Sequence, residues 1–233
     1  MNIIKYLQAQ GLGSRKQCTQ LIQYDLIAIN GCLKNNTNED IAPNDVVALE
    51  INGEKQIPVP YPFFYILLNK PADYETSHKP KHYPSVFSLL PPNLLNLPMQ
   101  AVGRLDADTT GVLIITNDGQ FNHRITSPKH KVPKRYRAVL KHAADERLCA
   151  QLRSGVLLHD DNETVCAEQA ELADAHTLIM VISNGKYHQV KRMVAAAGNR
   201  VEQLHREQFG AWRTDGLSVG EWRFFQPDQL ITS

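Results

Sequence analysis

Apolar residues in the first part of the chain recur with the periods of short helices and strands. One helical face is formed by Ile3, Ile4, Leu7 and Leu12. Ser14 is a suitable N-cap for a second helix over residues 15–24. Asn30-Gly31 is a favoured two-residue turn between strands, and residues 45–51 supply a further strand. The pattern predicts a small unit over residues 1–55 with little core of its own.

A proline-rich segment follows this unit. Residues 56–62 contain Pro58, Pro60 and Pro62, which favour an extended chain and cannot donate to a central sheet. We therefore predict a linker over 56–62 and a larger domain over 63–233.

The larger domain alternates apolar strands with helical patterns. Strands are predicted at 63–68, 112–116, 135–140, 165–172, 177–183, 201–204 and 209–212. Helices are predicted at 121–125, 146–153 and 187–197, and residues 72–98 read as a long loop with a short helix near 86–90. Mixed order and short connections predict an α+β fold, with a mixed, mostly antiparallel sheet flanked by helices.

Charge is distributed unevenly, although the formal net charge is only +1. Residues 120–144 contain no acid but include Arg124, Lys129, Lys131, Lys134, Arg135, Arg137 and Lys141. A second basic group comprises Lys186, Lys191, Arg192, Arg200 and Arg206. These groups are either two solvated faces or the footprint of a polyanion, and the acid-free stretch favours the polyanion.

Other compositional features narrow the class of protein. Cys18, Cys32, Cys149 and Cys166 form no C-x-x-C pair, which argues against a zinc site and favours free thiols. Apolar runs are too short for a membrane span, and the N-terminus lacks the pattern of a secretory signal. We expect a cytoplasmic protein without a metal ion.

The stretch GRLDADTTGVLIITNDG, residues 103–119, places two acids before an apolar strand. In the simplest interpretation, Asp106 and Asp108 satisfy backbone amides of a turn. A D-x-D-x-T match also suggests a phosphatase of the haloacid-dehalogenase type. That chemistry needs the acids after a buried strand, whereas here the apolar run follows them.

A third interpretation starts from Arg104. A guanidinium near a carboxylate favours its ionised form, and an ionised aspartate can act as a nucleophile without a metal or cofactor. Because the flanking segments are basic and suit a nucleic acid, the group attacked by the aspartate would belong to a nucleotide. The base of that nucleotide would have to be flipped out of its stack. Such a site needs a cation beside Asp106, an aromatic residue for the base and a basic track for phosphates.

Four motifs in this order resemble pseudouridine synthases of the RsuA type, which modify ribosomal RNA and carry an S4-like domain before the catalytic domain. The motifs are Leu67-Leu-Asn-Lys-Pro71, Gly103-Arg-Leu-Asp-Ala-Asp-Thr-Thr-Gly111, Thr126-Ser-Pro-Lys with Lys134-Arg-Tyr136, and Gly185-Lys-Tyr-His-Gln-Val-Lys-Arg-Met193 followed by Leu204-His-Arg-Glu207. The resemblance runs from end to end, and in the first unit it rests on Gly13-Ser-Arg15 and residues 27–31. One departure is Asp73, where relatives usually carry glycine.

The resemblance implies roles for individual residues and no cofactor. Asp106 would be the catalytic aspartate, with Arg104 displacing or replacing the flipped base. Tyr136 would pack on the uracil ring, Lys191 would pair with Asp106, and Val190 would line the base pocket. Substrate binding is expected from Lys70, Lys134, Arg192 and, in the first unit, Arg15.

The sequence around Tyr187-His-Gln-Val-Lys-Arg is closer to the small-subunit enzyme than to the large-subunit ones, which tend to carry Asn-Arg-Gln-Val-Arg-Arg. We therefore expect isomerisation of a uridine in 16S rRNA, namely uridine 516. The alternatives are a 23S rRNA enzyme of the same branch, or a non-catalytic S4-type RNA-binding assembly factor. The expected partner is ribosomal RNA or a small-subunit assembly intermediate, bound by a monomer. The first unit is weakly acidic overall, which leaves its contribution to RNA binding open.

Overall fold

The computed structural model describes residues 1–158, 160 and 162–227. The chain divides into two compact units. The first comprises Met1–Phe64 and Phe87–Met99, and the second comprises Tyr65–Val86 and Gln100–Ser233. Residues 87–99 fall within the predicted larger domain, whereas their contacts group them with the N-terminal residues. No helix of the described residues is long and apolar enough to cross a membrane.

The first unit contains three helices and a four-stranded sheet. The helices are α1 (Ile3–Ala9), α2 (Arg15–Gln23) and α3 (Pro92–Leu95). The sheet has the order β2 (Cys32–Leu33), β1 (Ile27–Ile29), β3 (Leu49–Ile51) and β4 (Glu54–Gln56), with antiparallel pairing throughout. The predicted helices and the Asn30-Gly31 turn are confirmed, whereas β4 extends the sheet into the predicted linker.

The start of α2 shows how sequence determines a local boundary. The Ser14 side chain accepts a hydrogen bond from the Gln17 backbone N–H, and the Gln17 side chain accepts one from the Ser14 N–H. Such a capping box is worth about 1 kcal/mol at the N-cap position. Ser14 is therefore confirmed as the N-cap.

The second unit is built on one mixed sheet of nine strands among the described residues. Its main path runs β11 (Gln169–Asp174), β12 (Thr177–Ile182), β8 (Lys134–Leu140), β13 (Val201–Phe209), β7 (Thr110–Thr116), β5 (Tyr65–Lys70) and β15 (Trp222–Phe224). In addition, β14 (Trp212–Arg213) pairs with β13, and β6 (Gln100–Val102) pairs with β7. Only the β13–β7 pair is parallel among these strands, so the predicted mixed, mostly antiparallel α+β sheet is confirmed.

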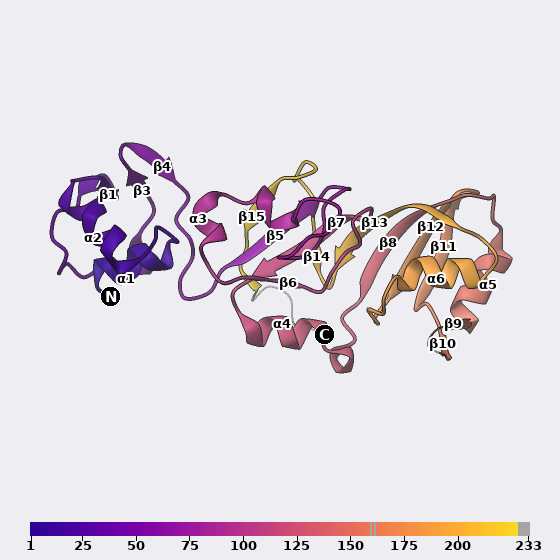
Figure 1. The fold of residues 1–233 in the computed structure, drawn as a ribbon. Coiled ribbons are helices and arrows are strands. Elements are labelled where there is room, and N and C mark those ends of the chain that lie inside the picture. The colour runs from indigo at the N-terminus through magenta and orange to yellow at the C-terminus, as the bar shows by residue number, and fades with distance from the viewer. Residues whose placement is uncertain (159, 161, 228–233) are drawn as a thin grey trace. The chain divides into compact units, whose positions relative to one another are not determined.

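Helices accompany this sheet at three places (Figure 1). They are α4 (Gly119–Thr126) after β7, α5 (Glu146–Ser154) after β8, and α6 (Gln189–Ala196) after β12. A short hairpin of β9 (Val156–Leu158) and β10 (Glu163–Val165) contacts α6 through β9. The three predicted helices are thus present, with boundaries shifted by a few residues.

Strand predictions differ from the structure where short apolar runs are ambiguous. Residues 201–204 and 209–212 were predicted as separate strands, but β13 continues through Val201–Phe209 and turns only at Gly210. The predicted strand at 165–172 is divided between β10 and β11. Hydrogen bonding to a neighbouring strand decides such boundaries, and a single strand's pattern does not contain that information.

Gly111 allows the parallel pair at the centre of the sheet to form. It has φ +101°, a conformation that other residues rarely adopt. A Cβ atom at this position would lie 2.2 Å from the Arg206 carbonyl oxygen. The glycine therefore lets β7 approach β13, which brings the loop before β7 beside the β13 side chains.

Candidate active site

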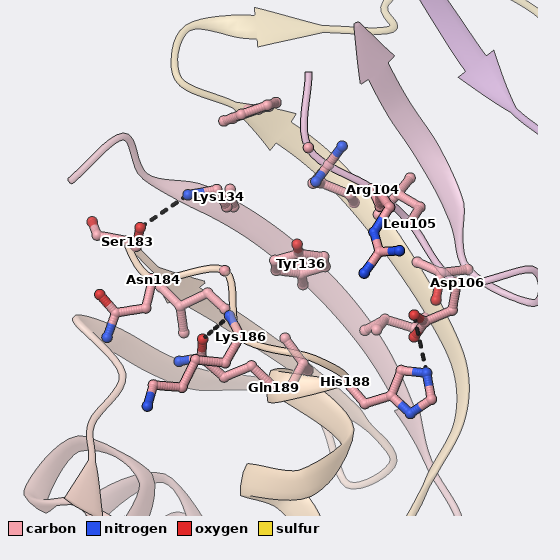
Figure 2. Close-up of a pocket in the computed structure, with 18 of the residues that line it drawn as sticks. Arg104, Leu105, Asp106, Lys134, Tyr136, Ser183, Asn184, Lys186, His188 and Gln189 are labelled. Carbon is pink, nitrogen blue, oxygen red and sulfur yellow. Dashed lines mark hydrogen bonds and ion pairs between the residues drawn. The ribbon is translucent and has the colours of Figure 1, made fainter. Parts of the chain in front are cut away.

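A cavity of about 430 Å³ lies entirely within the second unit (Figure 2). Its walls come from the 103–109 loop between β6 and β7, from β8 and β13, and from residues 182–190, which lead from β12 into α6. All of these segments converge because the sheet order places β12, β8, β13 and β7 next to one another. The cavity thus collects the motifs that sequence analysis identified far apart in the chain.

Asp106 lies in the 103–109 loop, at one side of this cavity. Its carboxylate lies 3.1 Å from His188 Nε2 and 3.4 Å from Lys191 Nζ. The Asp106 side chain is 27% exposed, so it is held in place but remains accessible to a bound molecule. Figure 2 shows Asp106 and His188 pointing toward each other at the cavity edge. Two nitrogen partners on different positions orient the carboxylate.

Lys191 pairs more closely with Asp108 than with Asp106. Its Nζ donates to both Asp108 carboxylate oxygens, at 2.7 and 2.8 Å. Partial burial alone would raise the pKa of the Asp108 carboxyl, but the hydrogen bond and charge of Lys191 lower it overall. Lys191 therefore bridges two carboxylates, which refines the expected pairing with Asp106 alone.

Lys70 holds the loop that carries Asp106 through hydrogen bonds to backbone carbonyls. This side chain is fully buried, and its Nζ donates to the carbonyls of Pro71, Ala107 and Thr109 at 2.9, 3.0 and 2.9 Å. Burial lowers the pKa of Lys70 to about 8, opposed by the nearby carboxylates of Asp108 and Asp106. The expectation that Lys70 binds substrate is wrong for this structure, because all of its donor directions point to backbone oxygens of its own chain.

Asp73 forms a further hydrogen bond to the same loop. Its backbone N–H donates to the Ala107 carbonyl at 2.9 Å, and its φ is +62°. Aspartate tolerates this left-handed conformation better than most residues. The site where relatives usually carry glycine therefore requires a positive φ, and the aspartate meets that requirement.

Tyr136 and Val190 provide apolar surface inside the cavity. Both are almost completely buried and both line it, Tyr136 from β8 and Val190 from the first turn of α6. Figure 2 shows Tyr136 between Lys134 and the Asp106 loop. A flat aromatic ring in such a wall is suited to stacking on a planar ligand.

Two cations lie on the strands that form the cavity floor. Lys134 Nζ donates to the Val132 and Ser183 carbonyls at 2.8 and 2.9 Å, and burial together with the Arg206 charge lowers its pKa to about 8. Arg206 is 2% exposed, and its Nε donates to the Val112 carbonyl at 2.8 Å. The cavity therefore has a carboxylate at one side and buried positive charge in its floor.

The remaining predicted residues are placed differently. Arg104 lines the cavity but is exposed, and it forms no ion pair with Asp106 within the part of the chain that the structure describes. Arg192 on α6 faces Asp160, 3.5 Å away, and is not part of the cavity wall. Arg15 is an exposed residue of α2 in the first unit. The partners of Asp106 are thus His188 and Lys191 rather than Arg104.

His188 and Arg206 were not among the predicted site residues. Both lie within motifs that the sequence revealed, but their roles depend on tertiary contacts. His188 has φ +46° and precedes α6, which turns its ring toward Asp106, and the Tyr187 ring stacks on it at a centroid distance of 3.7 Å. Unusual backbone conformations of this kind are frequent at functional sites. Among the described residues, no group of three or more His, Cys, Asp or Glu side chains is arranged to hold a metal ion.

Comparison with known proteins assigns this arrangement to a family. The family described as RNA pseudouridylate synthase matches residues 64–196, which include the Asp106 loop, Tyr136 and the start of α6. The chain belongs to this family. RNA pseudouridylate synthases are isomerases, and the chain is therefore an enzyme of that class.

Full-length relatives confirm the resemblance to the RsuA type. The chain is 38% identical to ribosomal small subunit pseudouridine synthase A of Vibrio parahaemolyticus, over 99% of this chain and 98% of the relative. It is 36% identical to the protein of the same name from Escherichia coli, over 100% and 99%. A crystal structure of a pseudouridylate synthase superimposes with a TM-score of 0.67 at 33% identity, covering 98% of this chain and 97% of the other. The likeness of this pseudouridine synthase to these proteins therefore extends over the whole chain and is not confined to the catalytic motifs.

Proposed function

We propose that this pseudouridine synthase isomerises a uridine of 16S ribosomal RNA, with Asp106 as the catalytic carboxylate that acts on a flipped-out nucleotide. The observation that carries this proposal is the position of Asp106 at the edge of a nucleotide-sized cavity, held by His188 and Lys191. The position supports a group that must be ionised, oriented and accessible at the same time.

The reaction requires that the uracil stay captive between two steps. The N-glycosidic bond breaks, the ring rotates, and a carbon–carbon bond forms between C5 and the ribose. Tyr136 would hold the ring by stacking, which is worth about 1–3 kcal/mol per base on aromatic platforms. Val190 would close the apolar side of the pocket. Asp106 would act at the ribose or on the ring, and its ionised form suits either route.

Basic residues near the cavity suit the RNA backbone. Arg104 is exposed at the cavity rim, where it can contact the RNA as the base flips. Arg192, which pairs with Asp160 and does not line the cavity, would act near the RNA backbone rather than on the base. Lys134 would act within the cavity, with its ammonium group held by two carbonyls.

The choice of 16S rRNA rests on the names of the relatives. Proteins from Vibrio parahaemolyticus and Escherichia coli that match over the whole chain are named for the ribosomal small subunit. The Tyr187-His-Gln-Val-Lys-Arg sequence favours the same choice, and we propose uridine 516 as the target. The substrate would be the RNA itself or a small-subunit assembly intermediate, bound in the cytoplasm by a monomer.

We further propose that the first unit is an S4-like RNA-binding domain. Two short helices followed by an antiparallel sheet, with Arg15 exposed on α2, support this proposal. Such a unit would recognise RNA by shape and by phosphate contacts rather than by base sequence.

The experiment that tests the target is pseudouridine mapping in cells lacking the protein. Sites in 16S and 23S rRNA would be compared between the deletion strain, the strain complemented with wild type, and the strain complemented with Asp106→Asn. We expect one 16S pseudouridine to disappear and to return only with wild type. Loss of a 23S site instead would move the target to the large subunit. Unchanged maps would contradict the proposed target in both RNAs.

A further inference from the structure

Arg206 has a donor that the protein does not use. Its Nη2 is buried and has no hydrogen-bond partner among the described residues, although its Nε is bound to the Val112 carbonyl. The guanidinium lies against the Phe209 ring, with Cζ 4.8 Å from the ring centroid, and it lines the cavity. Leaving a buried charged donor without an acceptor is unfavourable, so the arrangement is complete only when a ligand supplies one.

The acid next to Arg206 on β13 does not pair with it. Glu207, the next residue along β13, pairs instead with Arg135 and Arg137, at 3.1 and 2.7 Å. Lys134, a cation that lines the same cavity, already donates to two carbonyls. Burial and the Arg206 charge lower the Lys134 pKa, while the Glu168 charge opposes them, so Arg206 and Lys134 lie close enough to repel each other.

Strand register places Arg206 beside the proposed base platform. Arg206 on β13 is the direct partner of Tyr136 on β8, and directly opposed residues of antiparallel strands share one face of the sheet. Both residues line the same cavity. A ring that stacks on Tyr136 therefore brings its edge within reach of the unused Arg206 donor.

We propose that Arg206 Nη2 donates a hydrogen bond to a ring carbonyl oxygen of the flipped uracil, and that it stabilises the ring while it is detached from the ribose. This inference rests on the proposed function. A phosphate is a poorer candidate, because a phosphodiester is joined to nucleotides on both sides and stays at the cavity mouth. The flipped base is the part of the nucleotide that enters the cavity most deeply, so it is the part that can contact Arg206, which is only 2% exposed.

A hydrogen-bond donor at this position would stabilise the uracil most strongly while the ring is detached from the ribose. On the route through C1′, an Asp106 carboxylate oxygen bonds to C1′ while the N1–C1′ bond breaks, and the electron pair leaves with the uracil. The resulting monoanion carries its charge on O2 and O4, where a fixed cation with a free N–H stabilises it. After rotation, C5 bonds to C1′ and displaces the carboxylate, C5 loses its proton, and N1 gains one. The product is an isomer of the substrate, with no added reagent.

The test combines protein variants with modified RNA. Wild type, Arg206→Lys and Arg206→Gln would each act on RNA with uridine, 2-thiouridine or 4-thiouridine at the target position. Single-turnover rates and the RNA Kd would be measured separately, with Arg213→Gln, a surface arginine paired with Asp215, as the matched control. We expect Arg206→Gln to slow isomerisation by about 100- to 1,000-fold, as removal of one such donor does elsewhere, with the RNA Kd unchanged.

The thiouridines test the hydrogen bond between Arg206 Nη2 and the uracil carbonyl directly. Each replaces one carbonyl oxygen with sulfur, which is a weaker acceptor. One thio substitution should slow the wild type and have little further effect in Arg206→Gln. Equal rates for the variant and wild type, or thio effects of the same size in both, would overturn the inference. If the glutamine variant does not fold, equal wild-type rates on all three RNAs overturn it. A wild type that isomerises no uridine would instead contradict the proposed function.

Discussion

At the scale of single residues, the contact between His188 and Asp106 determines how the carboxylate faces the cavity. The 3.1 Å separation joins two side chains that are both about one-third exposed, so the interaction is moderate rather than strong. We predict that His188→Ala lowers the single-turnover rate of pseudouridine formation by about 10-fold, since a hydrogen bond to a charged group is worth roughly 1.5–3 kcal/mol before solvent screening. The measurement is the rate at saturating enzyme.

The RNA Kd serves as the internal control for His188→Ala. A positioning role predicts an unchanged Kd, because the ring contacts Asp106 rather than the exposed phosphate-binding residues. A lower affinity with an unchanged rate would mean that His188 contacts RNA and does not orient the carboxylate.

Sequence identifies the chemical types of the site residues better than it identifies their surroundings. The acidic loop at 103–109, Tyr136 and Val190 stand out by motif, and the structure brings them to one cavity. Lys70 was expected from the family resemblance to bind substrate, yet here it is fully buried and donates to backbone carbonyls of the loop region. Arg206 could not be distinguished from a surface arginine before β13 was known to pair with β8.

At the scale of elements, β5 and the Asp106 loop are joined through Lys70. Burial lowers the Lys70 pKa from 10.5 to about 8, so between these pH values the unfolded chain retains a proton that the folded chain has lost. The contribution of this group to stability therefore increases as pH rises from 8 to 10.5 and is flat below 8. We predict that the unfolding free energy of wild type rises relative to Lys70→Met over this window, measured by urea unfolding at several pH values.

The comparison between the two proteins cancels the titration of all other groups. Lys70→Met also leaves three carbonyl oxygens of the loop region without their donor, and its activity should therefore fall at every pH. Parallel stability curves for the two proteins from pH 8 to 10.5 would show that Lys70 is charged throughout and that its burial does not shift the proton equilibrium.

The parallel pair of β7 and β13 depends on Gly111. We predict that Gly111→Ala destabilises the second unit by about 3 kcal/mol or more, because the added carbon would clash with the Arg206 carbonyl in addition to the strain of a positive φ. Gly216→Ala is the matched control, since Gly216 has φ +78° and open space around its Cα. Equal losses in thermal or urea unfolding would mean that only backbone strain matters and that β7 can move away from β13.

Long periodic elements were predictable from sequence, and short ones were not. Helices α2 and α5 carry clear caps and apolar faces, so their positions follow from local chemistry. Strands β15 and β9 have three residues each and exist because a neighbouring element pairs with them. The division of 201–212 into two strands failed for the same reason, because β8 supports one continuous partner.

At the scale of the whole molecule, a net charge of +1 conceals a strongly basic segment. Lys129 and Lys131 are exposed and follow α4 within the acid-free stretch of residues 120–144. We predict that replacing both with glutamine weakens RNA binding at low salt and reduces the slope of log K against log salt by about 1 per lysine. The double variant Arg147→Gln/Arg213→Gln is the control, because both arginines pair with aspartates on the same chain.

Binding titrations from 50 to about 200 mM salt would distinguish these variants. Equal slopes for the lysine variant and wild type would show that the acid-free stretch is only a solvated face. The interpretation of the charge pattern as an RNA footprint would then be wrong. This result would not bear on the proposed role of Asp106, which the activity of Asp106→Asn tests.

The most direct test of the central claim is the rate of pseudouridine formation by Asp106→Asn on a 16S rRNA substrate, with Asp108→Asn as the paired control. Asp108 shares Lys191 with Asp106 but is more exposed, at 66% against 27%. We predict no detectable product from Asp106→Asn with RNA binding retained, and substantial activity from Asp108→Asn. Pseudouridine formation by Asp106→Asn would contradict the account, because the carboxylate at the cavity edge would then not perform the reaction.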